Sequence, residues 1–244
     1  MDVATLKGLR ADLDTYVDEF APCFRSDQAR EHLGTYMRGQ LGPLPRKSLE
    51  PIALEAGVPP RNLQQFLGLL RWEAADVART VRRLVVRDHA APDAIGVVDG
   101  PAYCKQGKQT VGVQRQYSSE AGKVENCVAT VHLDYVTGTG FHTLVDSDLY
   151  LSESWTSDAE RRAAAGIPAD VEHRTKWQIA LSLIARSLGD GVPLRWITAD
   201  EEFGRASEFL AGVAGMGALY VVEIPRNVFG WTAGRLKEGR RTQR

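Results

Sequence analysis

The chain has 244 residues, of which 43% are hydrophobic and 25% charged, and its formal net charge is −1. These values fit a soluble globular protein and exclude a strongly basic chain, so any nucleic-acid-binding surface has to be local. Three cysteines without a Cys-x-x-Cys pair exclude a disulfide framework, and we expect all three to be buried. Because acidic residues interrupt the first 20 residues, we expect neither a signal peptide nor a membrane span, and a cytoplasmic location.

Residues 1–90 are expected to form a small all-α domain. Apolar residues recur at helical spacing over 62–72 and 74–86. The segment 47–67 resembles a helix-turn-helix, in which Ala53 and Gly57 would provide the close helix approach and the turn. The second helix would carry four polar side chains able to reach base edges, and these are Arg61, Asn62, Gln64 and Gln65.

The local charge of the same region also suits DNA. Between Arg38 and Arg87 there are nine Lys or Arg and four Asp or Glu, a local net charge of +5. Such a surface favours contact with phosphates, and we therefore predict double-stranded DNA as the partner. A plain helical bundle remains the alternative, because turns of the Ala-x-x-x-Gly type are common in bundles.

From residue 91 onward the pattern is that of a mixed α/β sheet. Short apolar runs separated by turn residues predict an antiparallel meander with strands over 95–99, 110–117, 126–136 and 141–145. Helices and strands then alternate, over 176–188, 194–200, 205–213 and 218–224. This order predicts that the later strands of the 91–244 domain run parallel and are joined by helical crossovers.

Two of the predicted strands end in an aspartate. Ile95-Gly-Val-Val-Asp99 and Trp196-Ile-Thr-Ala-Asp200 are both apolar runs that stop at an acid. If the strands are neighbours, the carboxylates of Asp99 and Asp200 meet at one sheet edge, and a cation has to lie between them. Carboxylate oxygens select Mg²⁺ or Mn²⁺, and such ions support phosphoryl transfer. The alternative is that both aspartates only cap the turns that follow.

Further short motifs carry a resemblance to a known family. The densest are Lys105-x-Gly-Lys108, Val111-Gly-Val-Gln-Arg-Gln-Tyr117, Gly122-Lys-Val-Glu-Asn-Cys127, Leu149-Tyr-Leu-Ser-Glu-Ser-Trp155, Arg161-Arg162 and Ala165-Gly-Ile-Pro168. Together they resemble insertion-sequence transposases with a ribonuclease-H-like core and an Asp-Asp-Glu (DDE) site, in the branch with an insertion before the Glu. The resemblance implies that Asp99 and Asp200 are the first two catalytic and metal-binding acids. It also implies DNA strand cleavage and strand transfer at element ends, with a homodimer on DNA as the expected assembly.

The third acid of that family has no counterpart in this sequence. Glu201, Glu202 and Glu223 lie beside the sheet edge or within a strand, whereas the family's Glu lies on a later helix. The stretch 234–244 is predicted to be a solvated basic tail. We therefore expect a core that lacks its C-terminal part. Two functions stay open, a metal-dependent transposase and a catalytically inactive remnant that only binds DNA.

Three basic residues follow the first aspartate along the chain. They are Lys105, Lys108 and Arg115. Because basic side chains position a nucleic-acid backbone, these residues are candidates for guiding DNA into the site. A solvated hairpin without a role in binding explains them equally well.

Overall fold

In the computed structural model, the chain forms two compact units, Met1–Val81 and Arg82–Arg244. The structure describes residues 3–70, 72–118, 121–226, 229–230 and 242–243. The boundary between the units falls inside one helix, α5 (Ala74–Asp88), and the predicted functional division after residue 90 stays a prediction. Within the described ranges, no helix is long and apolar enough to cross a membrane.

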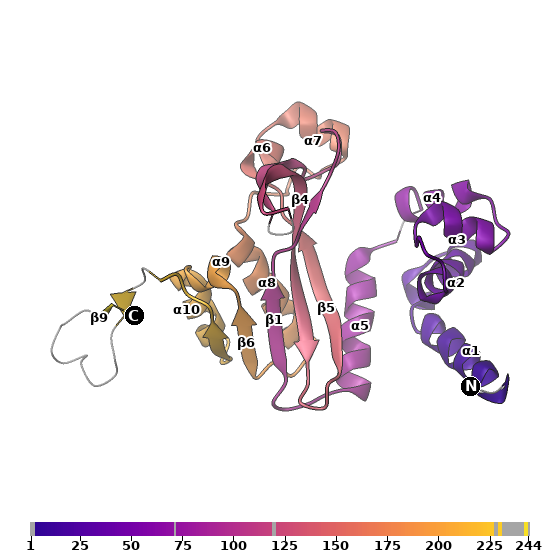
Figure 1. Cartoon of the computed structure of the whole chain (residues 1–244), viewed down its shortest axis with the longest axis horizontal. Coiled ribbons are helices and arrows are strands. Elements are labelled where there is room, and N and C mark those ends of the chain that lie inside the picture. The colour runs from indigo at the N-terminus through magenta and orange to yellow at the C-terminus, as the bar shows by residue number, and fades with distance from the viewer. Residues whose placement is uncertain (1–2, 71, 119–120, 227–228, 231–241, 244) are drawn as a thin grey trace. The chain divides into compact units, whose positions relative to one another are not determined.

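The first unit is helical in its described part (Figure 1), with a small apolar core. Its helices are α1 (Val3–Asp18), the 3-10 helix η1 (Ala21–Cys23), α2 (Asp27–Leu41), α3 (Leu49–Glu55) and α4 (Pro60–Gly68). Ile52, Ala53 and Leu63 are buried together, so α3 and α4 pack closely. Gly57, in the turn between them, has a φ of 68°, which a glycine adopts without steric cost. Two packed helices joined by a glycine turn thus occupy this segment, and its role as a DNA-binding helix-turn-helix stays a prediction.

The second unit contains a seven-stranded mixed sheet (Figure 1). Its strands are β1 (Ile95–Asp99), β2 (Ala102–Cys104), β3 (Gln114–Ser118), β4 (Lys123–Val136), β5 (His142–Leu149), β6 (Trp196–Ala199) and β7 (Leu219–Val222). The long strand β4 pairs antiparallel with β1, β2, β3 and β5, and β1, β6 and β7 are parallel neighbours. This arrangement confirms the predicted fold class, a ribonuclease-H-like mixed sheet in which a meander is followed by parallel strands.

The helices of the second unit that follow β5 lie between β5 and β7 along the chain. They are α6 (Glu153–Thr156), α7 (Ala159–Ala165), α8 (Lys176–Gly189), α9 (Glu201–Gly204) and α10 (Ser207–Gly215). The apolar face of α8, including the buried Ile179, Leu183 and Ile184, packs on β4 and β5. Helix α10 is the crossover from β6 to β7 and packs against α8 and β7. The predicted helical crossover between parallel strands is thus present.

The sequence pattern missed the short strand β2. Gly100-Pro101 interrupts the ladder without ending it, because Asp99 faces His132 and Ala102 faces Ala129 in one unbroken register along β4. The prediction that all cysteines are buried is confirmed for Cys127 but is wrong for Cys23, which is half-buried, and for Cys104, which lies on β2 and is exposed. A three-residue strand at the edge of the sheet leaves its outward side chains uncovered.

A cluster of four charged residues, of which Arg82 and Asp146 are buried, fixes α5 to the sheet within the second unit. The guanidinium of Arg82, which is 3% exposed, lies 3.0 Å from Asp146 Oδ2 and 2.7 Å from Asp190 Oδ2. Arg186 on α8 contacts the same Asp146 Oδ2 at 2.9 Å. Both carboxylates of this cluster are matched by arginines, as burial of a charge requires.

Two small terminal strands, β8 (Phe229–Gly230) and β9 (Thr242–Gln243), form a separate antiparallel pair. Most of the predicted basic tail, 234–244, lies outside the described residues, apart from the two residues of β9.

Candidate active site

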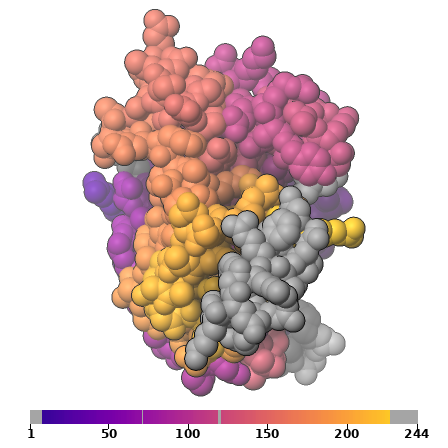
Figure 2. All heavy atoms as spheres, turned by 90° about the vertical axis from the view of Figure 1, so that its left-hand side faces the viewer, coloured from indigo at the N-terminus to yellow at the C-terminus, as the bar shows by residue number. Residues whose placement is uncertain are grey.

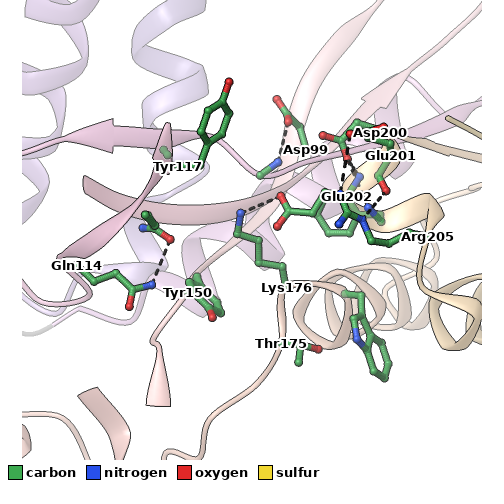
Figure 3. A pocket seen from close by; sticks show the side chains of 15 residues that line it. Asp99, Gln114, Tyr117, Tyr150, Thr175, Lys176, Asp200, Glu201, Glu202 and Arg205 are labelled. Atoms are coloured by element: carbon green, nitrogen blue, oxygen red, sulfur yellow. Dashed lines mark hydrogen bonds and ion pairs between the residues drawn. The ribbon is translucent and has the colours of Figure 1, made fainter. Parts of the chain in front are cut away.

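The parallel pairing of β1 with β6 brings the two predicted acids together. The register pairs Val97 with Thr198 and Val98 with Ala199, so the residues next in line are Asp99 and Asp200. Gly96 permits this close pairing, because a Cβ there would lie 2.8 Å from the Ile197 side chain. Two acids that are far apart in the sequence therefore stand side by side at the carboxyl end of the sheet (Figure 3).

Each aspartate is held by one of its oxygens. Asp99 Oδ1 accepts a hydrogen bond from the Gly100 backbone at 2.7 Å. Asp200 is the N-cap of α9, and its Oδ1 accepts from Glu202 N at 2.9 Å and Phe203 N at 3.4 Å. Neither Oδ2 atom has a hydrogen-bond or ion-pair partner within the described part of the chain. The capping predicted as the alternative role thus occupies one oxygen of each residue and leaves the other available.

Both acids line a cavity of about 700 Å³. Its remaining walls come from the β1–β2 segment, β3, the residue after β5, the start of α8, and the segment of α9. In Figure 2 the segment around residues 105–130 and the segment around 150–180 lie next to each other at one end of this unit. The lining residues outside the two aspartates are Gly100, Ala102, Gln114, Gln116, Tyr117, Tyr150, Thr175, Lys176, Trp177, Glu201, Glu202, Phe203 and Arg205.

The charges in the cavity do not cancel. Lys176 Nζ lies 2.8 Å from Glu202 Oε2, and Arg205 lies 3.9 Å from Glu201 Oε1. These two pairs use both cations of the lining and two of its four carboxylates. Asp99 and Asp200 are left without a cationic partner among the described residues. The cavity therefore carries an uncompensated negative charge at the two strand ends.

Tyr150 forms part of the cavity wall beside this cluster. Its pKa lies above the ordinary value, because burial disfavours the phenolate and the nearby Glu202 carboxylate adds repulsion. The Tyr150 side chain is therefore neutral at physiological pH, and its hydroxyl can donate a hydrogen bond. Lys176 Nζ lies 6.0 Å from the centroid of the ring, within reach of a weak cation–π interaction.

The predicted DNA-contacting residues of the first unit lie on α4. Arg61 and Gln64 are exposed, Asn62 and Gln65 are half-buried, and the apolar Leu63 and Phe66 between them are buried in the unit. The polar face of α4 is thus free to meet a ligand, while its apolar face holds the helix in place. Their contact with DNA stays a prediction.

The basic residues after the first acid are exposed but lie outside the cavity wall. Lys105 and Lys108 belong to the loop after β2, and Arg115 lies on β3, where its guanidinium donates to the Val124 carbonyl at 3.1 Å. The side chain of Asn126 holds the loop by donating to the backbone carbonyls of Lys105 and Gly107. None of the three basic residues lines the cavity as far as the structure is described. Their role in guiding DNA stays a prediction.

Several site residues were not predicted from the sequence. Lys176, Tyr150 and the pair Gln114 and Gln116 reach the cavity from elements that the motif analysis did not connect with the acids. The Gln114 amide donates to Gln116 Oε1 at 3.2 Å, so the two side chains form a fixed pair. One signal was available for Lys176, because Thr175 and Gln178 form a capping box that marks the start of a helix.

Trp155 and Arg161, which belong to two of the resemblance motifs, are structural. Trp155 is 2% exposed, and its Nε1 donates to the Val113 carbonyl at 2.9 Å. The Arg161 guanidinium lies 3.5 Å above the centre of the indole ring. Together they anchor the segment between β5 and α8 on the loop before β3.

Comparison with known proteins identifies the family. The sequence matches the DDE superfamily endonuclease family over residues 19–244, which is almost the whole chain. The chain belongs to this family. Endonucleases of the DDE superfamily generally use divalent metal ions.

A curated relative points the same way. The chain is 27% identical over 222 residues to a protein of Microchaete diplosiphon described as "Probable transposase for insertion sequence element IS701". The match covers 87% of this chain and 54% of the relative, so the chain spans about half the length of the curated relative it matches. A solved structure, "Drosophila P element transposase strand transfer complex", aligns with a TM-score of 0.36 and 10% identity over 82% of this chain and 42% of that chain. The family match and the curated relative confirm the resemblance to insertion-sequence transposases and do not favour the alternative of a remnant that only binds DNA.

The donor chemistry of the cavity fits a divalent cation in part. Two carboxylates at neighbouring strand ends, each with one oxygen lacking a partner, are hard ligands of the kind that Mg²⁺ and Mn²⁺ prefer. Across the described ranges, no group of three or more His, Cys, Asp or Glu side chains is arranged to hold a metal ion. The described residues thus supply part of a coordination shell.

Proposed function

We propose that this chain carries the catalytic site of an insertion-sequence DNA transposase, which cleaves and joins DNA strands at the ends of its element. The observation that carries the proposal is the pairing of β1 with β6, which aligns Asp99 and Asp200 and leaves both without a cationic partner in the described cavity. The family match and the transposase relative support the same reaction.

Asp99 and Asp200 would hold Mg²⁺ or Mn²⁺ through the oxygens that the backbone leaves free. Such ions activate an attacking oxygen and stabilise the leaving oxygen in phosphodiester chemistry. The protein's own contribution is positioning. The backbone hydrogen bonds to Oδ1 of each aspartate fix the carboxylates before DNA binds, so little reorganisation is needed when the strand enters.

DNA would be bound by more than the cavity. The exposed polar face of α4, with Arg61 and Gln64, suits base edges in a major groove. Lys105, Lys108 and Arg115 lie on the same unit as the acids and suit phosphate contacts. A homodimer on DNA is part of the proposal, because the two ends of an element have to be processed together.

Strand cleavage of a supercoiled plasmid that carries the element's ends tests the proposal, first with Mg²⁺ and then with Mn²⁺. We expect nicking that Asp99→Asn and Asp200→Asn both abolish. The matched control is Asp148→Asn, because Asp148 is paired with Arg174 at 2.7 Å and does not line the cavity as described. Nicking that survives in both variants would contradict the assignment. Metal-independent DNA binding without nicking would favour the remnant that only binds DNA.

A further inference from the structure

Lys176 is the better-placed of the two cations in the cavity wall. Its side chain is 19% exposed, and its ammonium lies 2.8 Å from Glu202 Oε2 (Figure 3). A Cβ added to Gly100 would lie 3.6 Å from Lys176 Nζ and 3.5 Å from Glu202 Oε2. The Lys176–Glu202 pair therefore lies against the backbone of the residue that follows Asp99.

The backbone that carries the Lys176 side chain is held in place. Lys176 is the first residue of the 14-residue helix α8, and the preceding Thr175 caps that helix. Gln178 N donates to Thr175 Oγ1 at 3.4 Å, and Thr175 N donates to Gln178 Oε1 at 2.8 Å, so the capping box is complete. The start of a helix also carries a partial positive charge, which adds to that of the ammonium. An anion that enters the cavity thus meets the Lys176 ammonium, whose backbone is held in place by the capped helix.

The partner of Lys176 is held only weakly. The Glu202 side chain is 44% exposed and sits on the four-residue helix α9. Ion pairs with that degree of exposure contribute little to stability, so a competing anion can replace the carboxylate. A phosphate that accepts charge-assisted hydrogen bonds from a lysine is such a competitor.

We propose that Lys176 is a phosphate-contacting residue whose ammonium rests on Glu202 in the free protein and passes to a DNA phosphate when a strand enters the cavity. The inference rests on the proposed function and adds the residue that receives the backbone beside Asp99. Glu202 keeps the Lys176 ammonium in the cavity. Without this partner, the lysine side chain would sample many rotamers. On release, Glu202 turns to solvent, to which it is already exposed.

A double-mutant cycle on DNA affinity tests the exchange. Wild type, Lys176→Met, Glu202→Gln and the double variant are titrated with a fluorescein-labelled 30-base-pair duplex in EDTA, over a series of salt concentrations. If the ion pair breaks on binding, Glu202→Gln strengthens binding about two- to fivefold more when Lys176 is present than in the Lys176→Met background. The salt slope of Lys176→Met becomes less negative by up to about 0.9, the loss of one phosphate contact. Lys176→Arg retains most of the affinity.

The pair Lys123–Glu125 is the matched control. It has the same 2.8 Å separation, lies on β4, and does not line the cavity as described. The effects of Lys123→Met and Glu125→Gln on DNA affinity should multiply without coupling. Equal gains from Glu202→Gln in both Lys176 backgrounds would overturn the proposal, because they would show only a long-range charge effect.

The cycle separates this inference from the proposed function. Because it is run in EDTA, it does not depend on the metal, and Asp99→Asn should leave the coupling between Lys176 and Glu202 in place. Coupling without any metal binding at Asp99 and Asp200 would contradict the proposed function alone. Metal binding at the aspartates without coupling would contradict the exchange alone.

Discussion

Two clusters of acids and bases on the same sheet behave in opposite ways. In the cluster around the buried Arg82, Asp146 and Asp190 are both matched by Arg82, and Asp146 also contacts Arg186. In the cavity, Glu202 is matched by Lys176, but Asp99 and Asp200 have no cation within the described part of the chain. The first cluster is complete without a ligand. The second leaves two carboxylates unmatched, and under the proposed function a cation from solution joins them.

The difference follows from burial and from the fold. A buried carboxylate without a partner costs several kcal/mol, so Asp146 has to be matched by the protein itself. Asp99 and Asp200 are exposed at the ends of their strands, where water solvates the surplus charge. The buried Asp146 is thus matched within the fold, whereas Asp99 and Asp200 are not matched by any described residue.

The largest effect is expected from breaking the cluster around the buried Arg82. Arg82→Met leaves Asp190 without its partner and Asp146 with only one, and the free energy of unfolding should fall by about 3 kcal/mol or more. Urea unfolding followed by circular dichroism measures it. Arg82→Lys, which keeps one positive charge, should lose less. An unchanged midpoint in both variants would show that the cluster does not hold α5 in place.

A smaller effect is expected where the backbone supports the cavity. A Cβ on Gly204 would overlap the backbone carbonyl oxygen of Glu223, so Gly204→Ala has to shift α9, the helix that Asp200 caps. We expect a loss of about 1–3 kcal/mol in the free energy of unfolding, together with weaker Mn²⁺ binding. Gly215→Ala is the control, because a Cβ there meets nothing within 4 Å. Equal behaviour of the two variants would contradict this role of Gly204.

The smallest effects on stability are expected in the cavity itself. Asp99→Asn removes one of two neighbouring like charges, and Asp200→Asn keeps a residue that caps helices about as well as aspartate. Lys176→Met breaks only an exposed ion pair. The free energy of unfolding of all three variants should stay within about 1 kcal/mol of wild type. A loss comparable with that of Arg82→Met would show that the cavity charges are structural.

The sequence predicted the strand ends better than the rest of the cavity. The apolar runs before Asp99 and Asp200 predicted two strands and where each strand ends. The structure has both strands, as β1 and β6. The contributions of Lys176 and Tyr150 could not be predicted in the same way, because they depend on how the segment after β5 folds back over the sheet. The exposed Cys104 was mispredicted because residue type does not reveal that β2 is a three-residue edge strand.

Binding of Mn²⁺ to wild type, Asp99→Asn, Asp200→Asn and the control Asp148→Asn tests the central claim most directly. Electron paramagnetic resonance of the free ion during a titration gives the affinity without requiring cleavage. The account predicts that wild type and Asp148→Asn bind alike, whereas each of the other two variants loses at least about tenfold in affinity, because each removes one of the two anionic ligands. Equal Mn²⁺ affinity in all four proteins would contradict the assignment of Asp99 and Asp200 as a shared metal site.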